Sequence, residues 1–194
     1  MMAAWARRWR VVALAGFCGL LLAACATPNK IVGESGGQAF DRTGRFAVTV
    51  AYRDGHQDAV QGGFAWHDAG SQLVLDLANP LGSTLARVKV STRMAVMTRS
   101  NGDVESAADP DALVAKVLGS PIPVAGLRDW LRGQTGAAPV SGLKKNPAGQ
   151  PMGFEQAGWQ VALSNYDTQG PRLLRLSRDE ADRDISVRLV VDGE

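Results

Sequence analysis

The chain has 194 residues, of which 45% are hydrophobic and 21% are charged, so it can form one ordinary domain with a sizeable core and is not compositionally disordered. The formal net charge is +2, but it falls to −1, with 18 basic against 19 acidic residues, without the three arginines at positions 7, 8 and 10. Because we expect those arginines to be removed with a signal segment, the charge excludes a strongly basic nucleic-acid-binding protein.

The first 24 residues have the pattern of a secretory signal. The three arginines precede a fourteen-residue apolar run, 11–24, whereas a membrane-spanning helix needs about 20 apolar residues. The run ends in Leu22-Ala23-Ala24-Cys25, which resembles a bacterial lipobox. We therefore expect residues 1–24 to be removed and Cys25 to become the lipid-modified first residue. The alternative is an uncleaved membrane anchor in which Cys25 has no special role.

Cys25 would be the only cysteine of the mature chain, because Cys18 leaves with the signal, and no disulfide could then form. Such a cysteine carries three acyl chains, more than the two signals that stable anchoring requires. In sorted lipoproteins an aspartate after the cysteine retains the protein at the inner membrane. Ala26 stands there instead, which implies the inner leaflet of the outer membrane. The polar, glycine-rich residues that follow predict a flexible tether, so that 25–39 comprises the lipidated cysteine and this tether.

Short runs in which apolar residues alternate with polar ones recur after residue 40, and this period of two is typical of strands with one buried face. Two pairs, Asp54-Gly55 and Asn101-Gly102, are typical of tight hairpin turns. The runs predict a meander of antiparallel hairpins. They lie at residues 46–52, 64–66, 73–77, 86–96, 159–163, 174–176 and 185–191.

The pattern changes to two short helices in the middle of the chain. Asp109-Pro110-Asp111 predicts a helix start, with apolar residues of 113–118 on one face and Gly119 at the end. A second helix carries Leu127, Trp130 and Leu131 before Gly133, and residues 133–153 predict a Gly/Pro-rich loop. The sum is a mainly β fold of eight or more strands, a curved sheet or open barrel capped by helices. Its interior is either a filled core or a cavity.

The sequence contains no recognisable catalytic or metal-binding motif. It has two histidines, His56 and His67, without metal-ligand spacing, and it has neither a nucleophile elbow nor a phosphate-binding loop. A His67-Asp68 pair lacks a candidate nucleophile. We therefore expect no enzyme, no metal, no nucleotide hydrolysis and no cofactor beyond the covalent lipid on Cys25.

One predicted turn carries an unusual residue. Asn79-Pro80-Leu81-Gly82 suits a type I turn, but its third position, usually polar, is a leucine. Leu81 at a turn tip cannot easily reach the core beneath its own sheet. It either packs against a neighbouring loop or is held out toward lipid, and the turn alone favours neither.

The sequence resembles the LolB family of outer-membrane lipoproteins in several motifs, which together span about 145 of the 170 mature residues. Two departures are the chain end at Val191-Asp192-Gly193-Glu194, where the family often has a tryptophan, and the long loop at 133–153. The matching motifs are Gly44-Arg45-Phe46, Gly63-Phe64-Ala65-Trp66, residues 79–84, 118–123 with Leu127, Trp130, Leu131 and Gly133, then 154–159, Tyr166-Asp167 and 185–191.

The resemblance implies a single domain over 40–194, an incomplete antiparallel β-barrel with a helical lid around an apolar cavity. It also implies that the protein accepts acylated lipoproteins from the periplasmic carrier LolA and inserts them into outer-membrane phospholipid. Leu81, with Pro80 and Gly82, would form the membrane-delivery loop. We expect a monomer that binds no nucleic acid. The acyl-pocket candidates are Phe46, Val48, Phe64, Trp66, Leu75, Trp130 and Trp159.

Three other classes of protein would share parts of this sequence pattern. A lipocalin-like lipoprotein that binds a small apolar ligand would have the barrel and the anchor but would not need an exposed turn leucine. A structural lipoprotein would have a filled core. An enzyme would need a polar cleft, which no motif in the sequence indicates.

Overall fold

The computed structural model of the chain describes residues 39–120 and 122–193. The expected signal segment, Cys25 and residues 26–38 of the expected tether therefore lie outside the described residues. All described strands and helices belong to one compact unit, Ser35–Glu194. This unit contains its own hydrophobic core and hence the contacts that it needs to fold by itself.

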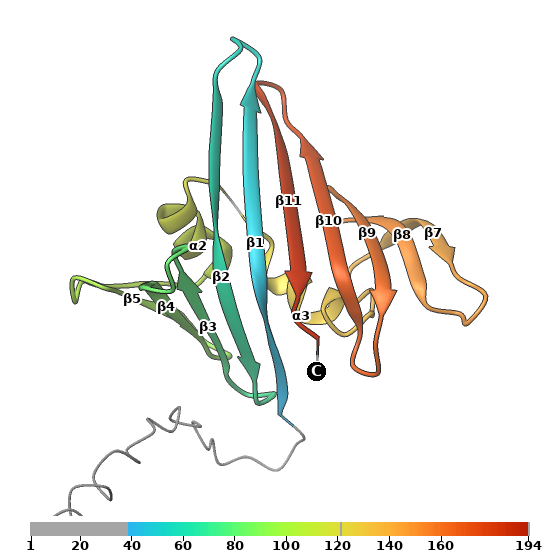
Figure 1. Ribbon diagram of the computed structural model, residues 1–194, viewed down its shortest axis with the longest axis horizontal. Coiled ribbons are helices and arrows are strands. Elements are labelled where there is room, and N and C mark those ends of the chain that lie inside the picture. Colours follow the sequence, from blue (N-terminus) through green and yellow to red (C-terminus); the bar gives the residue numbers. More distant parts are fainter. Residues whose placement is uncertain (1–38, 121, 194) are drawn as a thin grey trace, which may run out of the picture. The chain divides into compact units, whose positions relative to one another are not determined.

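Within the described residues, eleven antiparallel strands form one open sheet (Figure 1). The sheet order is β6-β5-β4-β3-β2-β1-β11-β10-β9-β8-β7, and the edge strands β6 and β7 do not pair with each other. The prediction of an incomplete antiparallel barrel with a helical insertion is thus confirmed. The strands are β1 (Phe40–Tyr52), β2 (Gln57–Asp68), β3 (Leu73–Ala78), β4 (Thr84–Val90), β5 (Ala95–Arg99), β6 (Val104–Ala107), β7 (Val140–Lys145), β8 (Pro151–Gln156), β9 (Trp159–Tyr166), β10 (Pro171–Asp179) and β11 (Arg183–Val191).

The chain order explains where the helices lie. The chain starts at the centre of the sheet with β1, runs outward to the edge strand β6, and then passes through α2 (Pro110–Leu118) and α3 (Val124–Trp130) to the opposite edge strand β7. From β7 it returns strand by strand until β11 pairs with β1. A connection between opposite edges must cross one face of the sheet, and Figure 1 shows both helices on the same side.

The helices begin and end where the sequence predicts. The Asp109 carboxylate accepts a hydrogen bond from the Asp111 backbone N–H at 2.9 Å, and Pro110 occupies the first turn of α2. Gly119 ends α2 with φ of 72°, a left-handed conformation that glycine adopts without a Cβ penalty. Leu113 and Val114 of α2 and Leu127 of α3 are buried against the sheet.

The predicted loop over 133–153 is wrong in part, because it contains strand β7 and the start of β8. All but the first residue of β7 are exposed, and its register with β8 shifts at two places. An edge strand with both faces toward solvent has no apolar alternation, so the period-two pattern could not reveal it.

Two glycines set the packing of two phenylalanines on the inner face of the sheet. Gly62 lies directly opposite Phe46, and Gly44 directly opposite Phe64. A Cβ at Gly62 would lie 2.0 Å from the Ala78 carbonyl oxygen and 3.1 Å from the Phe46 ring, and one at Gly44 would lie 2.9 Å from the Phe64 ring. Each ring thus covers the glycine of the neighbouring strand.

We expect Gly62→Ala to lower the free energy of unfolding by about 2 kcal/mol, because the added methyl group collides with backbone that is fixed in the sheet. Gly63→Ala is the matched control, since its nearest neighbour would be 3.7 Å away, and we expect a change below about 0.5 kcal/mol. Urea unfolding of both variants tests this, and equal destabilisation would contradict it.

Candidate functional site

An apolar cavity lies between the inner face of the sheet and the two helices. Five of the seven predicted pocket residues line it, from strands β1, β2 and β3: Phe46, Val48, Phe64, Trp66 and Leu75. The other lining residues, all apolar, are Leu77, Val114, Leu118, Ile122, Leu127, Val187 and Leu189. The cavity volume is about 30 Å³, roughly the share of one water molecule in the liquid.

The other two predicted pocket residues, Trp130 and Trp159, are buried but do not line this cavity. The Trp130 indole packs edge-on against Phe154 and donates a hydrogen bond from Nε1 to Gln156 Oε1 at 2.8 Å. Gln156 in turn donates to the Ala138 carbonyl oxygen at 2.7 Å. Trp130 therefore anchors α3 to strand β8.

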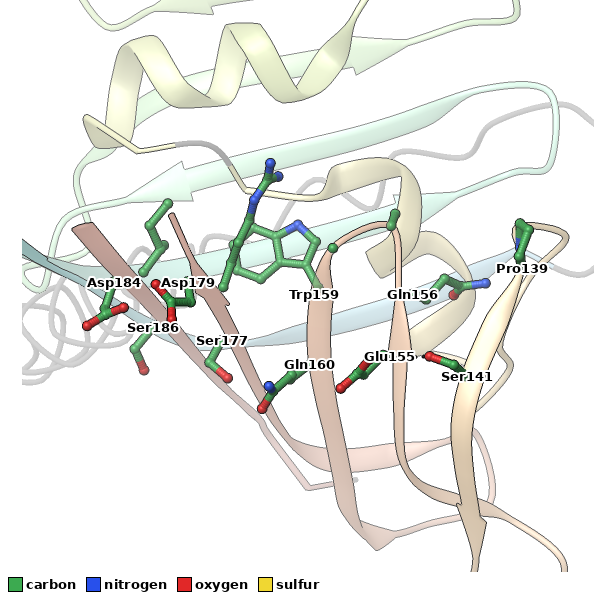
Figure 2. Close-up of a pocket in the computed structure, with 14 residues that line it drawn as sticks. Pro139, Ser141, Glu155, Gln156, Trp159, Gln160, Ser177, Asp179, Asp184 and Ser186 are labelled. Carbon is green, nitrogen blue, oxygen red and sulfur yellow. Dashed lines mark hydrogen bonds between the residues drawn. The ribbon is translucent and has the colours of Figure 1, made fainter. Parts of the chain in front are cut away.

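Trp159 borders a different, solvent-open hollow of about 570 Å³ over strands β7–β11 (Figure 2). Glu155, Gln160, Ser177 and Ser186 lie in register across these strands and line this hollow. Its lining mixes hydroxyl, amide and carboxylate groups with apolar ones, whereas the lining of the inner cavity is entirely apolar.

Three buried polar atoms near the inner face have no hydrogen-bond partner in the described structure: Trp66 Nε1, Arg42 Nε and Ser120 Oγ. Trp66 lines the cavity and lies directly opposite Arg42 in the β1–β2 register. Ser120 lies in the connection between α2 and α3, and Leu118 and Ile122 beside it line the cavity. Sequence reasoning missed Arg42 and Ser120, because nothing in their local pattern marks them as buried.

An ion-pair cluster holds α3 against the end of β2. The Asp68 carboxylate, 2% exposed, accepts hydrogen bonds from Arg128 at 2.6 and 2.8 Å and from Arg132 at 3.1 Å. Arg128 also donates to the Gly70 carbonyl oxygen. Burial by itself raises the pKa of Asp68, but the hydrogen bonds from Arg128, Gly70 and Arg132 lower it to about 2.

A second ion pair joins the two halves of the sheet at the same end. Arg42 on β1, 4% exposed, forms a bidentate pair with Asp167 at 2.7 and 2.8 Å. The Arg42 guanidinium holds the pKa of the Asp167 carboxyl below its ordinary value. Phe40 lies under the guanidinium groups of both Arg42 and Arg132, at 5.6 and 4.0 Å from the ring centre.

The turn between β3 and β4 holds Leu81 out from the molecule. The Gly82 N–H donates to the Asn79 carbonyl oxygen at 2.9 Å, and the Asn79 side chain accepts from the backbone N–H groups of Leu81 and Ser83 at 3.0 Å each. The predicted turn is thus present, and Leu81 is 92% exposed. Leu81 has no packing role against a neighbouring loop, so the first of the two sequence-based alternatives is wrong.

Among residues 39–120 and 122–193, no group of His, Cys, Asp or Glu side chains could hold a metal ion. The same residues contain no helix with the length and apolar character needed to span a membrane.

Fold and cavity together define a β half-barrel with an apolar interior beneath a helical cover. A family model described as "Outer membrane lipoprotein LolB" matches residues 38–193, and the chain belongs to the LolB family. Outer-membrane lipoprotein LolB of Bordetella pertussis is 55% identical over 173 residues, which cover 88% of this chain and 86% of the relative. The protein of that name from Cupriavidus necator is 36% identical over 188 residues, covering 92% and 95% of the two chains.

These matches support the predicted outer-membrane, lipid-anchored location. They also favour the LolB resemblance over the lipocalin-like alternative, because the matched family is LolB. A LolA-superfamily protein of Nitrosomonas europaea of known crystal structure has a TM-score of 0.41 and 8% identity, over 79% of this chain and 87% of that chain.

We expect Asp68→Asn to lower the free energy of unfolding by about 2 kcal/mol at pH 7, because the variant loses the ion pairs that hold α3. The pKa of Asp68 is depressed to about 2 in the folded protein, so these ion pairs stabilise the fold above its unfolded pKa and are lost as the pH falls toward 2. The difference between wild type and variant should therefore shrink between about pH 4 and pH 2.

The matched control is Asp179→Asn, which removes a carboxylate from an exposed pair with Arg53 and should change stability little at any pH. Chemical unfolding of the three proteins over this pH range measures the effect. A pH-independent difference for Asp68→Asn would contradict the assignment.

Proposed function

We propose that this LolB-family chain receives the acyl chains of lipoproteins on the inner face of its sheet and delivers the lipoproteins to the inner leaflet of the outer membrane. The carrier LolA would supply the acylated cargo, and Cys25 would anchor the chain at its destination. The observation that carries the proposal is the wall of the cavity, which consists entirely of apolar side chains under two helices.

The energetics of the cargo explain why such a wall is needed. Three acyl chains of about fifteen methylenes each, at ~0.8 kcal/mol per methylene, would cost on the order of 35 kcal/mol to expose to water. An apolar interior replaces the membrane as a solvent for these chains during transfer. Because the sequence has no phosphate-binding loop, each transfer step would run downhill in free energy.

The small cavity implies that the helices move when cargo binds. A volume of about 30 Å³ is far below what a long acyl chain occupies, since one water molecule alone accounts for about that volume in the liquid. Leu118, Ile122 and Leu127 from the helical segment form part of the cavity wall. Displacing this segment would open the apolar face of β1–β3 without breaking the sheet.

The length of the expected tether allows Leu81 to contact the membrane while Cys25 is anchored in it. Residues 26–39 can span up to about 50 Å when extended. The register aligns Phe40 with Asp68 and Asp68 with Leu73, so the Leu81 turn lies one β3 length, about 20 Å, from the level at which β1 begins. The tether therefore does not limit which end of the sheet faces the lipid.

We expect the unit without residues 1–25 to take cargo from a purified complex of the carrier with an acylated lipoprotein, with most of the cargo moving at equal concentrations and without nucleotide. Transfer from the carrier requires the unit to bind acyl chains more tightly than the carrier does. Release into the membrane requires it to bind them less tightly than the bilayer does. Affinity separation of the two proteins, followed by detection of the cargo, measures the transfer. Cargo that stays on the carrier, with the unit folded, would overturn the proposal.

We expect Leu81→Glu to accept cargo normally but to release it into liposomes at least about tenfold more slowly, because a carboxylate opposes insertion of the turn into hydrocarbon. Met94→Glu is the matched control: Met94 is another exposed apolar residue, 46% exposed, beyond the opposite end of strand β4. It should leave release unchanged. Sedimentation of the liposomes and detection of inserted cargo gives the rate, and equal rates for both variants would remove Leu81 from the delivery step.

A further inference from the structure

Two buried side chains on the neighbouring strands β1 and β2 each carry a hydrogen-bond donor without an acceptor. Trp66 Nε1 on β2 and Arg42 Nε on β1 are both unpartnered, and the two residues are direct partners in the strand register. Residues in this relation have Cβ atoms about 5 Å apart. Both residues are less than 5% exposed, so bulk water does not satisfy these groups, and a buried donor without an acceptor is destabilising.

A second buried indole N–H, that of Trp130, does have a hydrogen-bond acceptor. Trp130, also buried, donates its indole N–H to Gln156, which is itself held by the Ala138 carbonyl oxygen. An acceptor for a buried indole is thus present at Trp130 and absent at Trp66, the tryptophan that lines the cavity. Buried indole N–H groups usually have a partner, which suggests that the partner of Trp66 arrives with a ligand.

The two donors favour a carbonyl oxygen over water or phosphate. A carbonyl oxygen accepts two hydrogen bonds and brings no hydrogen of its own, whereas a water molecule brings two, for which the apolar wall offers no acceptor. A phosphate would need a free positive charge, but Asp167 already neutralises Arg42 through a bidentate ion pair. A neutral ester or amide is the ligand group that these donors fit.

We propose that Trp66 Nε1 and Arg42 Nε bind the carbonyl oxygen of an ester-linked or amide-linked acyl chain, and so position the polar head of the lipid beside Trp66 in the wall of the apolar cavity. The Ser120 hydroxyl, the third unpartnered group, supplies a further donor from the helical segment. Trp66 thereby distinguishes acyl chains from plain alkyl chains. This inference rests on the proposed function, because it assigns a subsite within the same cavity.

The test compares two synthetic lipopeptides with chains of equal length, one with ester-linked chains on its cysteine and the other with ether-linked chains that lack the carbonyl groups. Their dissociation constants are measured by displacement of a fluorescent fatty acid from the unit without residues 1–25. We expect wild type to prefer the ester lipopeptide by about fivefold. Trp66→Phe, which keeps an aromatic ring and removes the N–H, should abolish this preference, so that the variant binds the ester and ether lipopeptides with equal dissociation constants.

Trp130→Phe is the matched control, because it makes the same change at an indole that already has its acceptor. It should leave the ester preference intact and lower the melting temperature of the ligand-free protein more than Trp66→Phe does, because only Trp130 loses a hydrogen bond as well as ring volume. Ser120→Ala should reduce the ester preference about twofold.

The outcomes separate the two proposals. If Trp66→Phe weakens both lipopeptides equally, or neither, the carbonyl subsite is overturned while acyl binding stands. If wild type binds neither lipopeptide, the proposed function falls and the subsite falls with it.

Discussion

The arrangement of the whole domain depends on one topological constraint, which is that the central strand β1 pairs with the last strand, β11. Within the described residues, the first strand lies in the middle of the sheet, and the segment from β6 to β7 connects its two edges. That segment must cross a face of the sheet, and its two short helices bury their apolar sides there. The cover over the cavity is therefore a consequence of strand order rather than a separate addition.

The helical cover is held in two physically different ways. Leu113 and Leu127 attach it through non-directional apolar burial, whereas Asp68 holds α3 through directed ion pairs with Arg128 and Arg132. Apolar contacts with the sheet can be exchanged for contacts with an acyl chain at small net cost. The ion pairs fix the C-terminal end of α3 to the end of β2, whereas the apolar contacts carry no such directional constraint.

Polar groups on the inner face are few, and their positions determine which ligand groups the site could bind. Arg42 is fixed by Asp167, a residue 125 positions away along the chain, so this buried cation is already neutralised. What remains are N–H and O–H donors without acceptors. A wall of apolar side chains that includes the unpartnered indole N–H of Trp66 is compatible with an acyl chain, which is hydrocarbon along its length and has a carbonyl group at its head.

The sequence by itself determined the local structure, because its signals are local. Alternation predicted the long strands, Asp109 and Gly119 predicted the bounds of α2, and Asn79 and Gly82 predicted the turn at Leu81. Family motifs supplied the half-barrel and the residues of its inner face. Strand β7 was missed because an exposed edge strand has no periodic pattern.

Only the tertiary structure decided which inner-face residues meet. Trp66 lines the cavity while Trp130 and Trp159 do not, although each of the three lies on the apolar face of its predicted strand or helix. The small cavity volume and the pairing of Arg42 with Trp66 in the strand register could not be predicted from the sequence either. Periodicity determines the face on which a side chain lies, but distances between remote strands depend on sheet order and curvature, which arise from contacts across the whole chain.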